Sequence, residues 1–333
     1  MPRIDIEALE DEWEEDHHLL ARRSRALSVK ARQAIEQLDV ARVIGLDRGR
    51  VTIVWDGEVM DAVLAGTMRG AKAAVGDRVR VRPPSGEGDT VRIVEVLERH
   101  SVLTRTADDA LGEERVVVAN ADQVVVVLAA DHLELGTRFL DRVLVAASVG
   151  GLDAAACINR VDLVADDEQA RAGVDEVVSR YAALEVPVRV TSALTGEGLD
   201  ELAASLAGTW SALTGHSGVG KSSLLNRLVP QAEQRIGELG RYGGRHTTVA
   251  ARAFHAPALD AWLVDTPGVR SFGLGGLSPA ALVEHFPELR GLGCHLDDCT
   301  HTGEPGCRID EADIHPARWE AYLRLRASLA EGE

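Results

Sequence analysis

The stretch that most constrains this chain is GHSGVGKS, residues 215–222. In the spacing G-x-x-x-x-G-K-S, glycines let backbone N–H groups and a helix N-terminus surround phosphate oxygens, while the lysine and the serine reach the terminal phosphates and Mg²⁺. An apolar run, TWSALT, precedes the motif, and a helical pattern, KSSLLNRLV, overlaps its end. The sequence therefore predicts a phosphate-binding loop between a strand and a helix.

The residues before and after this loop alternate between apolar runs and helical patterns. Nearly continuous apolar runs are typical of strands that are buried on both faces of a parallel sheet. Strands that alternate with helices predict a doubly wound α/β domain, which we place at residues 116–274. The predicted strands lie at residues 122–130, 152–159, 186–192, 209–215 and 261–267, and the helices before the loop lie at 137–151, 167–184 and 198–208.

Residues 158–162, INRVD, follow the second of these strands and are close to N-K-x-D, the guanine-reading element of GTPases. The Asp162 carboxylate can accept the N1 and N2 protons of guanine, a pair that adenine lacks, which favours guanine by roughly 10⁴-fold. Asn159 would fix the loop and face N7, and Arg160 would stack in place of the usual lysine. After the next strand, at Ser192 and Ala193, a backbone N–H would meet guanine O6.

Two further segments predict contacts with Mg²⁺ and the γ-phosphate. In DTPG, Asp265 would hold Mg²⁺ through water, and the Gly268 N–H would contact the γ-phosphate. In GGRHTT, Thr247 or Thr248 would complete the magnesium shell beside Ser222, and we favour Thr248. The predicted GTP-binding residues are Asn159, Arg160, Asp162, Ser192, Ala193, Gly215, His216, Ser217, Gly218, Val219, Gly220, Lys221, Ser222, Ser223, Asp265 and Gly268, with Ser222, Thr248 and Asp265 as magnesium ligands.

The order of these motifs is unusual. In a Ras-like GTPase the phosphate loop comes first and the base-reading elements come last, whereas here N-R-V-D and T-S-A precede the phosphate loop. The sequence therefore predicts a circularly permuted P-loop GTPase domain, whose motifs can still meet at the C-terminal ends of the parallel strands. The γ-phosphate loop would then lead directly into the C-terminal residues, so hydrolysis could move them.

Residues 39–98 have a different pattern, in which short apolar and polar alternations are separated by Gly and Asp-Gly turns. This pattern predicts a small antiparallel barrel of five strands, an OB-fold. The fourth strand, DRVRVRP, is rich in arginine. Two interpretations stay open: these arginines bind an oligonucleotide, or they only solvate an edge strand.

Residues 1–38 form a charged arm, acidic over residues 1–16 and basic over 21–32. It is either a solvated, disordered segment or a basic tail that touches RNA. The net charge of −17 over 333 residues argues against sequence-blind binding to bare nucleic acid. No apolar run reaches the ~20 residues that span a bilayer, and the acidic start is unlike a secretory signal, so we expect a cytoplasmic monomer without membrane contact.

The C-terminal residues 275–333 contain the spacing C-x₄-C-x-H-x₅-C and end in a helical pattern. Three thiolates and one imidazole are a full ligand set for a closed, structural zinc site. Disulfides are the alternative, and a reducing cytosol disfavours them. The predicted zinc ligands are Cys294, Cys299, His301 and Cys307, while Cys157 lies in an apolar run and is expected to be an inert core residue.

The permuted order, the GRHTT stretch, the zinc spacing and the N-terminal barrel together resemble the small ribosomal subunit-dependent GTPases of bacteria. The resemblance extends from about Asp39 to the C-terminus. It implies binding to the 30S subunit near its decoding region, contact with 16S rRNA, and a role in late maturation of the subunit. It also implies that the subunit stimulates hydrolysis of GTP to GDP, and that hydrolysis releases the protein.

One position gives a physical reason for this dependence. Val269 stands after D-x-x-G, where Ras-like enzymes have a glutamine that positions water, so we expect slow turnover without a partner. The resemblance nominates His246 as a substitute, beside Lys221 and Thr248 as catalytic residues. Alternatively, His246 only contacts rRNA.

Three other functions can be weighed against this one. A zinc metallochaperone-type GTPase would place its cysteines near the phosphate loop, but here they begin at residue 294. A nucleotide-dependent RNA-binding adaptor that does not hydrolyse GTP would have no need of Lys221, Ser222 and Asp265. An ATP-dependent small-molecule kinase is disfavoured by N-R-V-D.

Overall fold

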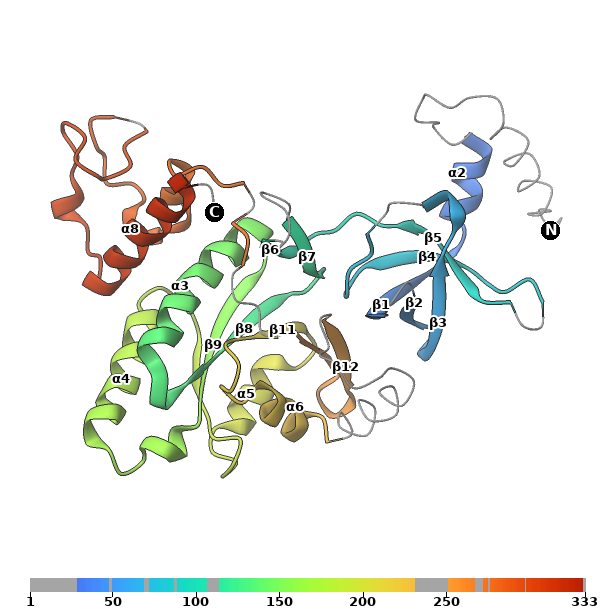
Figure 1. Cartoon of the computed structure of the whole chain (residues 1–333), viewed down its shortest axis with the longest axis horizontal. Coiled ribbons are helices and arrows are strands. Elements are labelled where there is room, and N and C mark those ends of the chain that lie inside the picture. Colours follow the sequence, from blue (N-terminus) through green and yellow to red (C-terminus); the bar gives the residue numbers. More distant parts are fainter. Residues whose placement is uncertain are drawn as a thin grey trace.

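The computed structural model describes residues 29–47, 50–68, 72–86, 89–106, 114–230, 251–266, 272–274, 276–296 and 298–331. They form a barrel, an α/β domain and a C-terminal zinc-ligand region, which lie in this order along the long axis (Figure 1). The multidomain α/β class predicted from the sequence is confirmed. The exact domain limits stay a prediction. Within the described ranges, no helix combines the length and apolarity needed to cross a membrane.

The α/β domain contains five parallel strands, all at positions that the sequence predicts. The strand that carries the phosphate loop lies between the first and the last of these parallel strands in sequence, an order that agrees with a permuted GTPase. An additional strand, β12 (Arg252–Ala256), pairs antiparallel with the last one and was not predicted. Across the sheet the parallel strands are β10 (Val188–Val190), β9 (Asp153–Asn159), β8 (Gln123–Ala129), β11 (Trp210–Thr214) and β13 (Ala261–Asp265).

Helices cover both faces of this sheet because successive strand residues point to opposite sides. Val124 and Val126 of β8 belong to one buried cluster, and Val125 and Val127 belong to another. The first cluster contains residues of α3 and α4, and the second contains residues of α5 and α6. The helices are α3 (Leu133–Gly150), α4 (Glu168–Ala182), α5 (Leu199–Leu206) and α6 (Lys221–Leu228).

The N-terminal strands close into a barrel in the order β1-β2-β3-β5-β4, with β4 paired back to β1. The expectation of a wholly antiparallel barrel is wrong at one place, since β3 and β5 run parallel. The reason is geometric, because five strands in a closed ring cannot all alternate in direction. The strands are β1 (Asp39–Asp47), β2 (Arg50–Trp55), β3 (Glu58–Leu64), β4 (Arg78–Arg82) and β5 (Val91–Val96).

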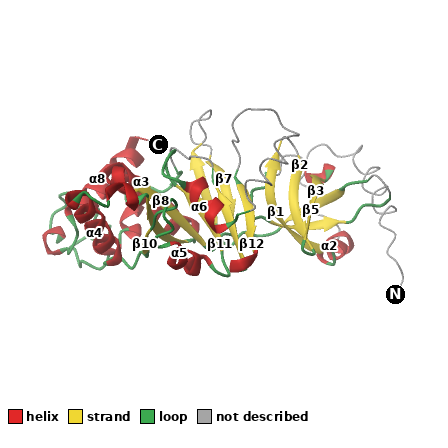
Figure 2. Cartoon of the chain, turned by 90° about the horizontal axis from the view of Figure 1, so that it is seen from below, coloured by secondary structure: helices red, strands yellow, loops and turns green. Residues whose placement is uncertain are grey.

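Two further elements were not predicted from the sequence. Residues 29–36 form a short helix, α2, at the end of the arm that was expected to be either a solvated, disordered segment or a tail that touches RNA. Contact of the arm with RNA stays a prediction. The hairpin of β6 (Val102–Thr106) and β7 (Glu114–Ala119) lies in the chain between the barrel and β8. Figure 2 shows the barrel and the α/β domain side by side.

Arg42 fixes the barrel against the α/β domain. Its guanidinium lies 3.5 Å from the centre of a ring of Trp210 and donates to the carbonyls of Gly76 and Asn120. Gly76 has a φ of +91°, and a Cβ at this position would lie 1.9 Å from the Ala119 carbonyl oxygen. Only glycine therefore allows the two backbones to approach so closely.

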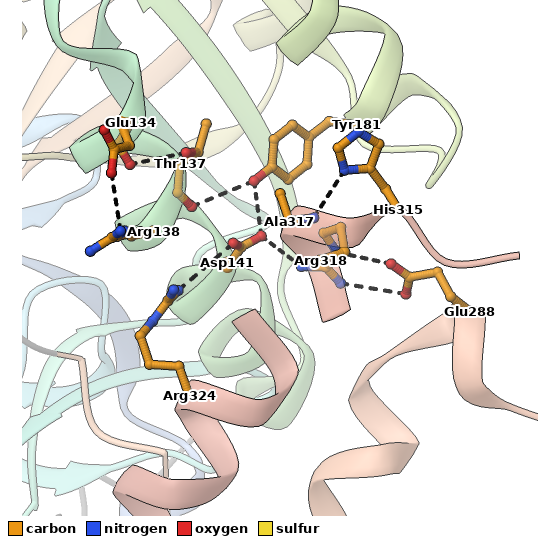
Figure 3. Close-up of polar contacts among 10 residues, drawn as sticks. All are labelled: Glu134, Thr137, Arg138, Asp141, Tyr181, Glu288, His315, Ala317, Arg318 and Arg324. Carbon is orange, nitrogen blue, oxygen red and sulfur yellow. Dashed lines mark hydrogen bonds and ion pairs between the residues drawn. The ribbon is translucent and has the colours of Figure 1, made fainter. Parts of the chain in front are cut away.

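A buried ionic network holds the last helix, α8 (Pro316–Glu331), on the α/β domain (Figure 3). Arg318 of α8 is 2% exposed and donates to Asp141 of α3 at 2.7 Å and to Glu288 at 2.9 Å. The Tyr181 hydroxyl of α4 donates to the same Asp141 carboxylate at 2.8 Å. Burial raises the pKa of Asp141, and the nearby Arg318 charge opposes this shift.

We expect Arg318→Ala to lower the free energy of unfolding by about 3–5 kcal/mol, because Asp141 and Glu288 would stay buried without their partner. Urea denaturation followed by circular dichroism measures this change. The control is Arg138→Ala on α3, since Arg138 only pairs with Glu134 at the surface and should cost about 0.5 kcal/mol or less. An equal loss of stability in the two variants would contradict the prediction.

Candidate nucleotide and metal sites

The phosphate loop joins β11 to α6, and its glycines are required by close contacts. Gly215 has a φ of +148°, and a Cβ there would lie 2.3 Å from the Val127 carbonyl oxygen. Gly220 has a φ of +95°, and its Cβ would lie 2.3 Å from Nδ2 of Asn159. Both contacts connect the loop to strands that precede it in the chain, so the loop is shaped by tertiary packing as well as by its own sequence.

Lys221 and Asp265 face each other in a cavity of about 390 Å³ at the C-terminal ends of the strands. Lys221 Nζ donates to the Gly215 carbonyl at 2.6 Å and to the His216 carbonyl at 3.0 Å. Burial lowers the pKa of Lys221 and raises that of Asp265, and each charge opposes the shift of the other. The cavity is lined by Ser217, Gly218, Gly220, Lys221, Ser222, Ser223, Asp265 and Thr266.

This lining suits a polyphosphate with a divalent cation. A partly buried ammonium and the N-terminus of α6 favour negative charge, while a partly buried carboxylate beside a hydroxyl favours a hard cation. Ser222 and Asp265, both predicted as magnesium ligands, line this one cavity. Another predicted residue, His216, packs its ring against Phe139, with ring centroids 4.7 Å apart.

Asn159 joins the base-reading residues to the phosphate loop. Its side chain is 1% exposed at the end of β9. Nδ2 donates to the Val219 carbonyl of the phosphate loop at 3.0 Å, and Oδ1 accepts from the Ala193 N–H at 3.0 Å and from Thr191 Oγ1 at 3.4 Å. The Ala193 N–H, expected to meet guanine O6, is thus already bonded to Asn159. One carboxamide connects three segments that are far apart in sequence.

The other residues of N-R-V-D lie beside the same loop. Arg160 has a left-handed φ of +67°. Its Nη1 donates to the Gly218 carbonyl at 3.4 Å and lies 3.4 Å from the Asp131 carboxylate. The Ser192 hydroxyl donates to the Asp162 carboxylate, which fixes its direction. Sequence reasoning missed Asp131, because an ion pair between distant segments leaves no local pattern.

Several predicted residues lie outside the described part of the chain. They are Thr247, Thr248 and His246 of the GRHTT stretch, together with Gly268 and Val269 after Asp265. Their roles stay predictions.

The four predicted zinc ligands come together in the C-terminal region. Their ligand atoms lie within 4.8 Å of one another. The sulfurs of Cys294, Cys299 and Cys307 lie 3.5, 3.6 and 3.5 Å from Nδ1 of His301. In a tetrahedron with zinc bonds of ordinary length, sulfur and nitrogen are about 3.6 Å apart. The residues therefore fit a closed zinc site and use Nδ1 of the histidine.

The metal-ligand loop is attached to α8. Tyr322 of this helix donates from its hydroxyl to the Thr300 carbonyl at 2.6 Å, and Arg326 donates to Thr300 Oγ1 at 3.2 Å. Glu304 accepts from the N–H groups of Thr300 and Thr302 at 2.9 and 2.7 Å. Hydrogen bonds, first of all that from the Thr300 hydroxyl, lower the pKa of Glu304 to about 2. A loop with so little apolar core depends on metal and polar contacts for its shape.

Comparison with known proteins identifies a family. The family model described as RsgA GTPase matches residues 96–275. The small ribosomal subunit biogenesis GTPase RsgA of Gemmatimonas aurantiaca is 40% identical over 294 residues, which cover 83% of this chain and 94% of the relative. The protein of the same name from Azotobacter vinelandii is 39% identical over 288 residues, which cover 84% of this chain and 82% of the relative.

Two solved structures have the same architecture. The crystal structure of YjeQ from Thermotoga maritima is 32% identical with a TM-score of 0.70, and the match covers 88% of this chain and 98% of that one. The structure of YloQ, described as a circularly permuted GTPase, has a TM-score of 0.67 at 21% identity, with 93% and 99% of the two chains covered. The second likeness supports the fold alone.

We expect the purified protein to contain one zinc ion per chain, and Cys299→Ser to lose most of it, because a hydroxyl does not replace a thiolate ligand. Metal analysis by mass spectrometry measures the content, and thermal unfolding with and without a chelator measures the stabilisation. The control is Cys157→Ala, which removes the buried cysteine of β9 and should keep its zinc. Full zinc content in Cys299→Ser would contradict the assignment.

Proposed function

This chain belongs to the RsgA GTPase family, and we propose that it hydrolyses GTP to GDP and phosphate during late maturation of the 30S ribosomal subunit. The observation that carries the proposal is the set of hydrogen bonds made by Asn159. They hold an N-x-x-D element against a phosphate loop that follows it in sequence, so one guanine nucleotide can contact both. Curated relatives that span most of this chain are named small ribosomal subunit biogenesis GTPases.

In this proposal the phosphate end of GTP occupies the cavity between Lys221 and Asp265. Lys221 leaves the loop carbonyls that it now contacts and binds the β- and γ-phosphates. Ser222 and Asp265, with Thr248, would hold Mg²⁺, which would supply positive charge beside the phosphate oxygens. The Gly268 N–H contacts the γ-phosphate.

The guanine base lies between the two base-reading segments. The Asp162 carboxylate, oriented by Ser192, accepts the N1 and N2 protons, while Asn159 faces N7 and Arg160 stacks over the base. Backbone N–H groups of the loop that contains Ala193 donate to O6. Because the loop is tied to Asn159, recognition of the base and the position of the phosphates are set by the same side chain.

Burial of two of the four zinc ligands favours a structural ion over a metallochaperone function. His301 is 5% exposed, and Cys299 is also buried. A metal delivered to a client would need accessible ligands, whereas these two flank Thr300, which Tyr322 and Arg326 of α8 hold by hydrogen bonds. The non-hydrolysing adaptor stays the second candidate, and a turnover assay separates it from a GTPase.

The proposed partners are the 30S subunit and its 16S rRNA. We also propose that the protein acts in the cytoplasm as a monomer. Val269 cannot orient a water molecule, so the activating group must come from elsewhere. We propose that subunit binding positions His246 for this role.

We expect purified 30S subunits to raise the rate of GTP hydrolysis by roughly 10³–10⁵-fold, the range for partner-supplied activation of GTPases. Phosphate release under multiple turnover measures it, with 50S subunits as the particle control and Lys221→Ala as the inactive variant. An unchanged rate with 30S would overturn the partner. His246→Ala should retain slow intrinsic turnover and lose the stimulation.

We expect Asp162→Asn to weaken GDP binding by roughly 100-fold or more and to strengthen binding of xanthosine diphosphate. The asparagine amide donates to the xanthine O2 but cannot accept two guanine protons. Competition against a fluorescent nucleotide measures both dissociation constants. The exposed neighbour Asp166 provides the control, because Asp166→Asn should bind like the unmodified protein. Retained guanine preference in Asp162→Asn would remove this residue from base reading.

A further inference from the structure

The loop that follows β10 carries the proposed O6 contact, yet little apolar burial holds its tip. Leu194 is 77% exposed, which leaves this side chain almost no packing. The first part of the loop is fixed from inside, since the Thr191 N–H donates to the Ile158 carbonyl at 2.7 Å and the Ala193 N–H donates to Asn159. Hydrogen bonds must therefore fix the outer side of the loop as well.

Arg227 supplies these bonds from α6, the helix that begins at Lys221. Its Nε donates to the Ala193 carbonyl at 2.8 Å, and its Nη2 donates to the Leu194 carbonyl at 3.0 Å. A planar guanidinium has donors in a fixed fork, which suits two successive carbonyl oxygens. The exposed Arg227 side chain thus binds the carbonyls of two consecutive residues of the loop.

Hydrogen bonds therefore connect the base-reading and phosphate-binding segments from both sides. From the base side, Asn159 reaches the Val219 carbonyl of the phosphate loop. From the phosphate side, Arg227 reaches back to the base-reading loop, about 9 Å along α6 from Lys221 at the helical rise per residue. A helix anchored at one end by the phosphate contacts then sets the position of the loop at its other end.

We propose that Arg227 is a positioning residue for guanine recognition, which holds the Ala193–Leu194 peptides so that loop N–H groups can meet O6. The inference rests on the proposed binding of a guanine nucleotide. Arg227 does not touch the nucleotide. It acts through the loop backbone, so its loss should weaken the O6 contact and leave the contact of Asp162 with N1 and N2 intact.

The test compares three nucleotides in Arg227→Ala and in the unmodified protein. GDP has both contacts, IDP lacks the N2 amine, and 6-thio-GDP replaces O6 with a weakly accepting sulfur. We expect Arg227→Ala to raise the dissociation constants of GDP and IDP by roughly fivefold, the factor for one hydrogen bond of typical net strength. The constant for 6-thio-GDP should rise less than about twofold, because its O6 contact is already weak. Competition against a fluorescent GDP analogue measures all three.

Matched variants separate positioning from a general loss of structure. Arg227→Lys keeps one cationic donor and should recover part of the affinity for GDP. Arg171→Ala removes an exposed arginine of α4 and should change none of the constants. Equal rises for all three nucleotides, or no rise for GDP, would overturn the inference. A failure of the unmodified protein to prefer GDP over ADP would instead contradict guanine binding itself.

Discussion

The nucleotide site depends on the buried carboxamide of Asn159. A buried amide that loses a partner costs about 1–3 kcal/mol, and this one has partners on both its nitrogen and its oxygen. Those partners belong to the phosphate loop and to the base-reading loop, neither of which is adjacent to Asn159 in the chain. The bonds therefore set the distance between the two ends of the nucleotide, a distance that local sequence cannot set.

Circular permutation leaves this geometry intact, because the geometry of a parallel sheet depends on which strands pair with each other and not on the order of the strands in the sequence. What changes is where the chain goes after Asp265. In residues 272–274, Phe272 forms an antiparallel β-bridge with Arg105 of the β6–β7 hairpin, and the Gly273 N–H donates to the Thr104 carbonyl at 3.1 Å. Arg142 of α3 donates to the Phe272 carbonyl at 2.9 Å. Residues 272–274 thus contact both the β6–β7 hairpin and α3, the helix on which α8 packs.

The sequence predicted the features that have a local period or a fixed spacing. The five parallel strands, the phosphate loop and the zinc-ligand spacing are of this kind. It did not predict the bonds of Arg227 to the base-reading loop, the pair of Arg160 with Asp131, or the network around Arg318. Each of these joins residues on separate elements, and an isolated arginine in a helix has the same local pattern whether it is paired or solvated. The parallel pair of barrel strands follows from ring closure, a global property.

The buried network limits how nucleotide hydrolysis can act on the C-terminal region. Separating Arg318 from Asp141 without hydrating them would leave two buried charges unpaired, at a cost of roughly 3–5 kcal/mol, whereas coupling between two ligand sites is typically 1–3 kcal/mol. The γ-phosphate alone is therefore too weak a signal to break this ion pair while it stays buried. A change at Asp265 is better transmitted through residues 272–274, where single hydrogen bonds to the hairpin and to Arg142 can exchange at lower cost. The C-terminal region would then move together with the α/β domain, while the hairpin beside the barrel responds to the nucleotide.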